Sequence, residues 1–314
     1  MTLDPLAKAF LDQLAAAPGP KASEVTPAEA RASFAALLKA YGPKDVPIGK
    51  IENLIMPGPG GDLALRIYTP VAAGGEALPA FVHFHGGGFR AGDFETYEPT
   101  SRLLAGEGAA RVIAVDYRLA PEHEFPAAVD DAIAATRWIE HNAATLGIDP
   151  NRIAVGGDSA GGNLAAVVCQ IAKAQGGPRI ACQLLMFPVT LFGSSFASMR
   201  DFAAGYLLEK DSLDFYYESY APPGTDWSDT RLSPLLATDF SGLPPAYVML
   251  AGCDPLHDEG RAYAEKLRAA GVDVTVADYP GLLHCFTQFQ TVFPQAHEAM
   301  IAAAKALRAA FETL

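Results

Sequence analysis

The stretch Gly156-Gly157-Asp158-Ser159-Ala160-Gly161-Gly162 decides how the rest of the chain is interpreted. It follows a short strand-like run at 152–155 and precedes a helical pattern of small residues at 163–174. A strand, a tight turn and a helix are the context in which a G-x-S-x-G motif exposes its serine. Glycines allow a turn too sharp for residues that carry a Cβ. The pattern therefore favours Ser159 as a nucleophile, although a glycine-rich turn with an incidental serine fits the same residues.

Composition excludes several classes of protein. The chain has 314 residues, half of them apolar, so it can bury a sizeable core in one α/β domain with insertions. A net charge of −13 without a basic run argues against nucleic-acid binding. The four cysteines lack C-x-x-C spacing, so neither a zinc site nor a disulfide framework is expected. Because we find neither a secretory signal nor an apolar run of about 20 residues, we expect a cytoplasmic protein without a membrane span.

Strand-like and helix-like segments alternate along most of the chain. This alternation predicts an α/β fold with a mostly parallel central sheet and helices on both faces. The first two strands are expected to form an antiparallel pair. The expected strands are 48–56, 63–69, 79–84, 111–117, 152–155, 181–187, 246–250 and 272–277. The helices expected between and after them are 127–146, 163–174, 257–270 and 294–311.

Two segments interrupt this alternation. Helical spacing at 3–14 and a capping box at Thr26-Pro27-Ala28-Glu29 predict two helices ahead of the first strand. Residues 189–235 hold nine aromatic side chains without strand alternation, which suits the wall or lid of an apolar pocket. For both segments, simple packing against the core is the alternative.

Three residues of complementary chemistry follow three of the expected strands. Ser159, Asp254 and His284 each lie just past the carboxyl end of a strand, the edge at which open α/β sheets bind ligands. A serine hydroxyl needs a base to take its proton, and an acid orients that base. The order Ser, Asp, His is the order found in α/β-hydrolases. We therefore predict that the three residues form a catalytic triad.

A run of three glycines, Gly86-Gly87-Gly88, also follows a buried strand and comes directly after His85. Backbone N–H groups that no side chain shields can bind a developing oxyanion. A flexible loop is the alternative, but flexibility alone does not explain the His-Gly-Gly-Gly order at a strand end.

Other ionisable residues compete less well for these roles. His83 lies inside a buried strand, where a hydrogen-bonded core residue is expected. Asp258 lies in the first turn of a helix, where it stabilises the helix dipole. Cys285 directly follows the expected base, and a buried thiol is predicted there because neighbouring side chains usually point apart. The remaining histidines, interpreted as solvated or structural, are His123, His141, His257 and His297.

In these motifs the chain resembles the bacterial hormone-sensitive-lipase family of α/β-hydrolase carboxylesterases, in its Gly-Asp-Ser-Ala-Gly branch. The matching stretches are 85–88, 116–122, 157–162 and 254–260. The match runs from about residue 50 to the end, and the two N-terminal helices also fit. The resemblance implies an α/β-hydrolase fold and hydrolysis of small esters with short to medium acyl chains, without a metal or cofactor.

The resemblance also implies roles for residues around the triad. It places the oxyanion hole at the amides of Gly87, Gly88 and Ala160, with Gly86 as a further neighbour. His85, Asp158 and the segment from Arg118 to Glu122 take supporting roles. The domains it implies are N-terminal cap helices at 1–45, a catalytic core at 46–188 and 236–314, and a cap insertion at 189–235.

One position departs from the family, which usually has glycine where this chain has Cys285 after the histidine. If the backbone there needs a positive φ, the substitution affects the local conformation; otherwise it only reshapes the pocket. Two other functions stay open: an amidase or peptidase with the same triad, and a non-catalytic small-molecule receptor on the same fold. A homodimer through the last strand and the C-terminal helix is a further expectation.

Overall fold

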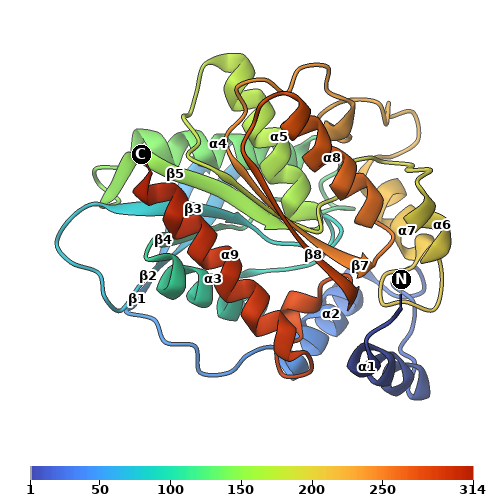
Figure 1. The fold of residues 1–314 in the computed structure, drawn as a ribbon. Helices are drawn as coiled ribbons and strands as arrows, with labels where there is room; N and C mark the ends of the chain where they lie inside the picture. The colour runs from blue at the N-terminus through green and yellow to red at the C-terminus, as the bar shows by residue number, and fades with distance from the viewer. Residues whose placement is uncertain (1, 314) are drawn as a thin grey trace.

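A twisted sheet of eight strands runs through the computed structural model, which describes residues 2–313 (Figure 1). The strand order is β1-β2-β4-β3-β5-β6-β7-β8. β1 and β2 pair antiparallel, as do β2 and β4, while all other neighbours are parallel. The expected mostly parallel α/β architecture is therefore confirmed. The strands are β1 Lys50–Gly58, β2 Gly61–Thr69, β3 Leu78–Phe84, β4 Arg111–Val115, β5 Ile148–Asp158, β6 Gln183–Met186, β7 Ala246–Cys253 and β8 Val274–Leu283.

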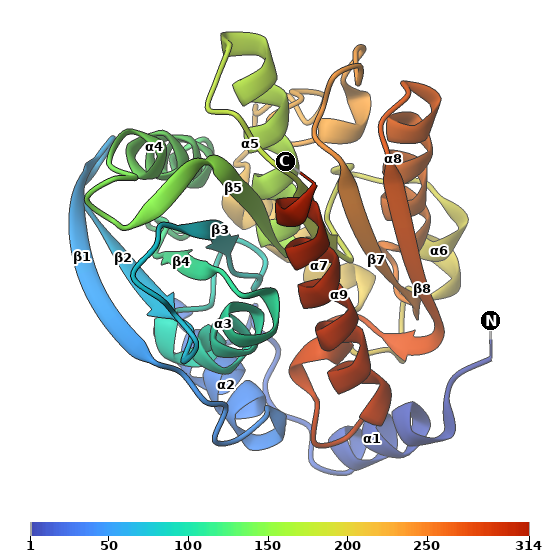
Figure 2. The ribbon, with the colours of Figure 1, turned by 60° about the vertical axis from the view of Figure 1, so that its left-hand side comes forward.

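Helices cover both faces of the sheet, as Figure 2 shows for α4 and α5 on one side and α3 and α9 on the other. Alternate residues of a strand point to opposite faces, so Val82 and Phe84 of β3 join one core while Phe81 joins the other. The core helices are α3 Phe94–Gly108, α4 Ala127–His141, α5 Ala160–Gln175, α8 His257–Ala269 and α9 Pro294–Glu312.

Helix α3 is absent from the elements expected from the sequence. Pro99 lies in its interior and two glycines lie in its last turn, and both residue types normally weaken a helix. Tertiary packing outweighs this local preference, because Leu103 and Leu104 are buried beside α9. Other expected elements exist with shifted ends: α4 ends at His141, and β8 continues to Leu283.

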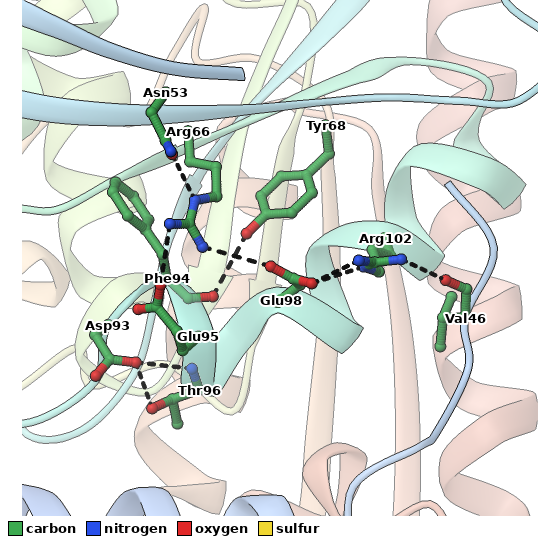
Figure 3. Close-up of polar contacts among 10 residues, drawn as sticks. All are labelled: Val46, Asn53, Arg66, Tyr68, Asp93, Phe94, Glu95, Thr96, Glu98 and Arg102. Carbon is green, nitrogen blue, oxygen red and sulfur yellow. Dashed lines mark hydrogen bonds and ion pairs between the residues drawn. The ribbon is translucent and has the colours of Figure 1, made fainter. Parts of the chain in front are cut away.

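A network of charged side chains fixes α3 against the sheet (Figure 3). Arg66 of β2 donates to Asn53 on β1 at 2.7 Å and pairs with Glu98 of α3 at 3.4 Å. Arg102 pairs with the same Glu98 at 2.6 Å and donates to the carbonyl oxygen of Val46 at 3.1 Å. The network therefore joins α3 to the first hairpin and to the connector that follows the N-terminal helices.

Further helices gather where the arrowheads of β7 and β8 point (Figure 1). The two N-terminal helices form as expected, and Thr26 and Glu29 make the predicted capping box. The segment 189–235 contains no strand, again as expected. These helices are α1 Pro5–Ala16, α2 Pro27–Tyr41, α6 Ala197–Asp201 and α7 Lys210–Tyr220, and short 3-10 turns lie at Pro234–Leu236 and Phe286–Gln288. Within residues 2–313, no helix has both the length and the apolar character needed to cross a bilayer.

Candidate active site

Ser159 lies in the sharp turn between β5 and α5. Its backbone has φ 54° and ψ −115°, a conformation that residues with a side chain rarely adopt. The turn also brings two glycines against the end of β3, because a Cβ on Gly157 or on Gly161 would overlap the carbonyl oxygen of Phe84. The G-x-S-x-G spacing thus allows β5 and the start of α5 to approach the end of β3 closely, and it places the serine in a strained position, as is common at functional sites.

Three loops bring Ser159, His284 and Asp254 into one hydrogen-bonded chain. The Ser159 Oγ lies 3.0 Å from Nε2 of His284, and Nδ1 of His284 lies 2.7 Å from Oδ2 of Asp254. The other carboxylate oxygen of Asp254 accepts from the backbone N–H of Leu256 at 2.8 Å. All three side chains are buried; Asp254 directly follows β7, and His284 directly follows β8. This is the arrangement expected from the sequence.

The charge of Asp254 favours proton transfer from Ser159 to His284. Burial disfavours a charged imidazole, but the adjacent Asp254 carboxylate outweighs this effect and raises the pKa of His284 well above its usual range. The Phe187 ring contacts the His284 ring edge-on, with 5.1 Å between centroids. His284 is therefore oriented and made more basic by its neighbours, as a general base requires.

The glycine loop presents unpaired amides beside the serine. Gly87 and Gly88 both have positive φ, at 115° and 62°. Within residues 2–313 their N–H groups donate to no acceptor in the protein. Ala160 is the first residue of α5, so its N–H also has no partner within the helix. Gly86 differs, because its N–H donates to Oδ1 of Asp158 at 2.9 Å and is already used.

Four buried side chains hold the glycine loop in shape. The second oxygen of Asp158 accepts from the Tyr97 hydroxyl at 3.1 Å, and burial raises the pKa of Asp158 to about 6. His85 has its Nδ1 2.7 Å from the Gly86 carbonyl oxygen. The Tyr117 ring stacks on His85, with 4.4 Å between centroids, and its hydroxyl donates to the His85 carbonyl at 2.7 Å. The supporting positions expected for His85 and Asp158 fit these contacts.

Ser159 and His284 open into a cavity of about 200 Å³. Side chains of α2, including Phe34 and Leu37, form one wall, and Leu213, Tyr216 and Tyr217 of α7 form another. A larger surface groove of about 720 Å³ lies between the ends of α5 and α9 and contains none of the residues expected in the site. The cavity is thus roofed by the two segments expected to form a cap.

The rival histidines His83 and His257 lie outside this cavity. His83 is buried with its Nδ1 3.1 Å from the Ser101 hydroxyl, as expected for a core residue. His257 contacts Asp258 at 2.9 Å and Asp278 at 3.3 Å, so it is structural. Among the described residues, no group of three His, Cys, Asp or Glu side chains is placed to hold a metal ion.

Cys285 differs from its expectation. A buried thiol was expected, but the residue is only partly buried, and it lines the cavity beside His284. Its backbone has φ 59° and ψ 16°, the left-handed conformation that favours glycine. The usual alternation of neighbouring side chains does not apply to such a residue, which explains why the expectation was wrong.

Two connecting residues carry no signal in the sequence. Arg31 of α2 donates to the carbonyl oxygens of Arg90 at 2.7 Å and Ala120 at 3.1 Å, and it pairs with Glu122 at 2.6 Å. In α8, Glu259 is fully buried, and one carboxylate oxygen accepts from the N–H groups of Thr190 and Leu191 at 2.8 and 3.2 Å. Burial raises the pKa of Glu259 to about 8. Only the tertiary fold reveals that these side chains attach α2 and the start of the 189–235 segment to the rest of the molecule.

A family profile for the alpha/beta hydrolase fold matches residues 81–288, which include the glycine loop and all three triad positions. The chain belongs to this family. It is 46% identical over 242 residues to carboxylesterase NlhH of Mycobacterium tuberculosis, covering 76% of this chain and 75% of the relative. It is 40% identical over 256 residues to an ethyl acetate hydrolase of Pseudomonas putida, covering 79% of each.

Solved structures of α/β-hydrolases resemble the chain over nearly its whole length. An α/β hydrolase from the metagenome of Lake Arreo, Spain, superposes with a TM-score of 0.96 at 42% identity, covering 99% of each chain. A hyperthermophilic esterase from the archaeon Pyrobaculum calidifontis gives 0.93 at 38% identity, covering 98% and 99%. The resemblance to hormone-sensitive-lipase-type esterases is thereby confirmed, while membership of the Gly-Asp-Ser-Ala-Gly branch stays a prediction.

Proposed function

We propose that this α/β-hydrolase is a serine carboxylesterase in which Ser159 is the nucleophile, His284 the general base and Asp254 the acid that orients it. The observation that carries the proposal is the continuous hydrogen-bonded chain of these three side chains beside unpaired backbone amides. Relatives named as esterases, at up to 46% identity over most of the chain, support the same reaction class.

The reaction proceeds through an acyl-enzyme in two halves. Ser159 Oγ attacks the ester carbonyl carbon as His284 Nε2 takes its proton, and the amides of Gly87, Gly88 and Ala160 stabilise the oxyanion. The tetrahedral intermediate collapses, His284 protonates the leaving alcohol, and the acyl group stays on Ser159. Water then attacks the acyl-enzyme with the same base and releases the acid. We leave Gly86 out of the oxyanion hole, because Asp158 accepts its N–H.

The cavity supports small substrates. A volume of about 200 Å³ beside Ser159 holds short to medium acyl chains better than long ones. We propose the α1–α2 region and the 189–235 insertion as the cap that sets this limit, since both line the cavity or pack around it. A receptor without catalysis is disfavoured because His284 is within hydrogen-bond distance of both partners.

Hydrolysis of p-nitrophenyl esters of increasing acyl length tests the proposal. We expect turnover with an optimum at short chains, and a fall of at least about 10³-fold in kcat for Ser159→Ala. The control is Ser101→Ala, which removes a buried hydroxyl that contacts His83 and lies outside the cavity. Equal turnover by wild type and a folded Ser159→Ala variant would rule out the mechanism. Matched p-nitroanilides would separate an amidase from an esterase.

We also propose a homodimer through β8 and α9. β8 is an edge strand of the sheet, and edge strands offer unpaired backbone groups to a second copy. The N-terminal segment covers only part of it, where the N–H of Asp4 donates to the Gly281 carbonyl oxygen at 3.0 Å. A monomeric mass by light scattering at micromolar concentration would contradict this assembly.

A further inference from the structure

The side chain of Arg90, two residues after the glycine loop, is buried without a hydrogen-bond partner. It is 7% exposed, and its Nε and Nη1 atoms have no acceptor among residues 2–313. None of the ion pairs in the described part of the chain includes it. It also lines the cavity that contains Ser159 and His284. A permanently charged group therefore lies buried at the active site without the partners that normally accompany it.

Nearby residues offset the burial of this charge only in part. The guanidinium carbon lies 4.3 Å from the centre of the Phe215 ring, which attracts the charge but accepts no N–H in the plane of the guanidinium. The Glu122 carboxylate also acts on the Arg90 charge, but it is paired with Arg31. Burial lowers the pKa of Arg90, and the positive charge of Arg31 adds to this effect. Unmade hydrogen bonds to a buried charge are costly, so an acceptor from outside the chain would stabilise the site.

The rest of the cavity lining indicates what kind of acceptor fits. Apart from His284, the described residues around the cavity are apolar, aromatic or small, together with Ser159 and the Cys285 thiol. Among the described residues that line the cavity, Arg90 carries the only permanent positive charge that an entering carboxylate would find. The guanidinium presents parallel N–H donors in a plane, a geometry that matches the two oxygens of a carboxylate.

We propose that Arg90 is a specificity-determining residue that binds a carboxylate on the ester substrate, remote from the bond being cleaved. The enzyme then favours half-esters of dicarboxylic acids, or esters of hydroxy acids, over neutral esters of the same shape. This inference rests on the esterase function proposed above and adds the chemical class of its substrate.

Pairs of substrates that differ only in charge test this preference, with hydrolysis followed by pH-stat. Monomethyl succinate carries the carboxylate on the acyl side, and in methyl 4-methylpentanoate an isopropyl group replaces it. For the alcohol side, 3-acetoxypropanoate is compared with isopentyl acetate. We expect wild type to favour the charged member of at least one pair in kcat/KM. Arg90→Met should lower that ratio by about 10- to 100-fold, the effect of losing hydrogen bonds to a charged group.

Two further variants separate charge recognition from a structural role. Arg90→Lys keeps the charge without the planar guanidinium, so its ratio of kcat/KM for the charged over the neutral ester should lie between those of wild type and Arg90→Met. If Arg90→Met does not fold, Arg90→Lys takes its place in the comparison. Arg231→Met is the matched control, because Arg231 also lies over an aromatic ring, Phe125 at 5.1 Å, but outside the cavity. Its ratio should equal that of wild type.

The outcomes distinguish failure of this inference from failure of the esterase proposal. If Ser159→Ala abolishes turnover of the neutral esters but no ratio depends on Arg90, the inference is wrong and the esterase proposal stands. A structural role through Phe215 alone would lower both members of each pair equally, which also overturns the inference. If wild type hydrolyses neither the neutral nor the charged esters faster than Ser159→Ala, the esterase proposal itself fails.

Discussion

At the scale of single residues, the site depends on two positions where a side chain occupies a backbone conformation that suits glycine. Ser159 has φ 54° and Cys285 has φ 59°, and the two flank the His284 imidazole in the cavity. The sequence indicates the first through its flanking glycines. It indicates the second only through the comparison with a family that usually has glycine there.

Replacing Cys285 with glycine should stabilise the protein. The left-handed conformation costs a residue with a Cβ about 1–2 kcal/mol, and the greater freedom of glycine in the unfolded chain offsets part of the gain. We expect the free energy of unfolding to rise by about 0.5–1 kcal/mol, measured by urea denaturation. Cys285→Ala, which keeps the Cβ, is the control and should stay close to wild type. A glycine variant less stable than the alanine variant would contradict this account.

The acidic limb of the pH–rate profile should report the pKa of His284. Only the neutral imidazole can accept the Ser159 proton, so kcat/KM rises with pH as His284 loses its proton. Because Asp254 raises the pKa of His284, the limb should lie above pH 6.5. In Asp254→Asn the limb should move to lower pH, while kcat falls by about 10³- to 10⁴-fold. Asp258→Asn, which does not contact His284, should leave the limb in place. A limb that stays fixed in Asp254→Asn would exclude this origin for the pKa shift.

At the scale of elements, the cavity has a fixed floor and two walls that are attached to it at separate points. The floor consists of the loops after β3, β5, β7 and β8, which the sheet holds in register. The α2 wall is attached through Arg31, and the insertion that contains α7 is attached to α8 through Glu259. Each wall can therefore be loosened without changing the triad.

Removing the Arg31 side chain should loosen α2 selectively. Arg31→Ala removes the contacts to the Arg90 and Ala120 carbonyls as well as the Glu122 ion pair. We expect faster hydrogen exchange of the α2 amides and a rise in KM of about 3- to 10-fold with a smaller change in kcat. Glu122→Gln removes only the charged partner and should give a smaller effect, since partly exposed ion pairs contribute little. Unchanged exchange in α2 would show that Arg31 is not its main attachment.

At the scale of the whole molecule, the sequence predicts the sheet and the position of the site better than it predicts the contacts that close the site. The alternation of strands and helices, the glycines around Ser159 and the positions of Asp254 and His284 identify the sheet edge where the site lies. Helix α3 is not predicted, because Pro99 and its terminal glycines mask a helix that tertiary packing stabilises. Arg31, Arg90 and Glu259 are not predicted either, since their roles depend on partners 59 or more residues away or on the shape of the cavity.

The pH dependence of global stability should carry the signature of two buried acids. Burial raises the pKa of Asp158 to about 6 and that of Glu259 to about 8, from 3.8 and 4.5. The folded state therefore keeps protons that the unfolded state releases, so their contribution is fully present below about pH 4 and is lost as pH rises toward 8. We expect Asp158→Asn with Glu259→Gln to remove the part of the decline that these two acids cause, measured as unfolding free energy from pH 4 to 9, while the part due to the raised pKa of His284 remains in both proteins. If the unfolding free energy of the double variant does not rise relative to that of wild type between pH 4 and 8, the assignment is contradicted.

The turn at Ser159 has one more consequence, which concerns the balance between durability and reactivity. Ser159→Gly should abolish hydrolysis and yet raise the melting temperature, because glycine adopts φ 54° and ψ −115° without the cost that serine bears. Ser159→Ala should be equally inactive without that gain, so thermal denaturation of the two variants isolates the backbone contribution. In a screen for thermal stability alone, the inactive Ser159→Gly variant would therefore be selected over wild type. Only selection for turnover would retain serine at this position.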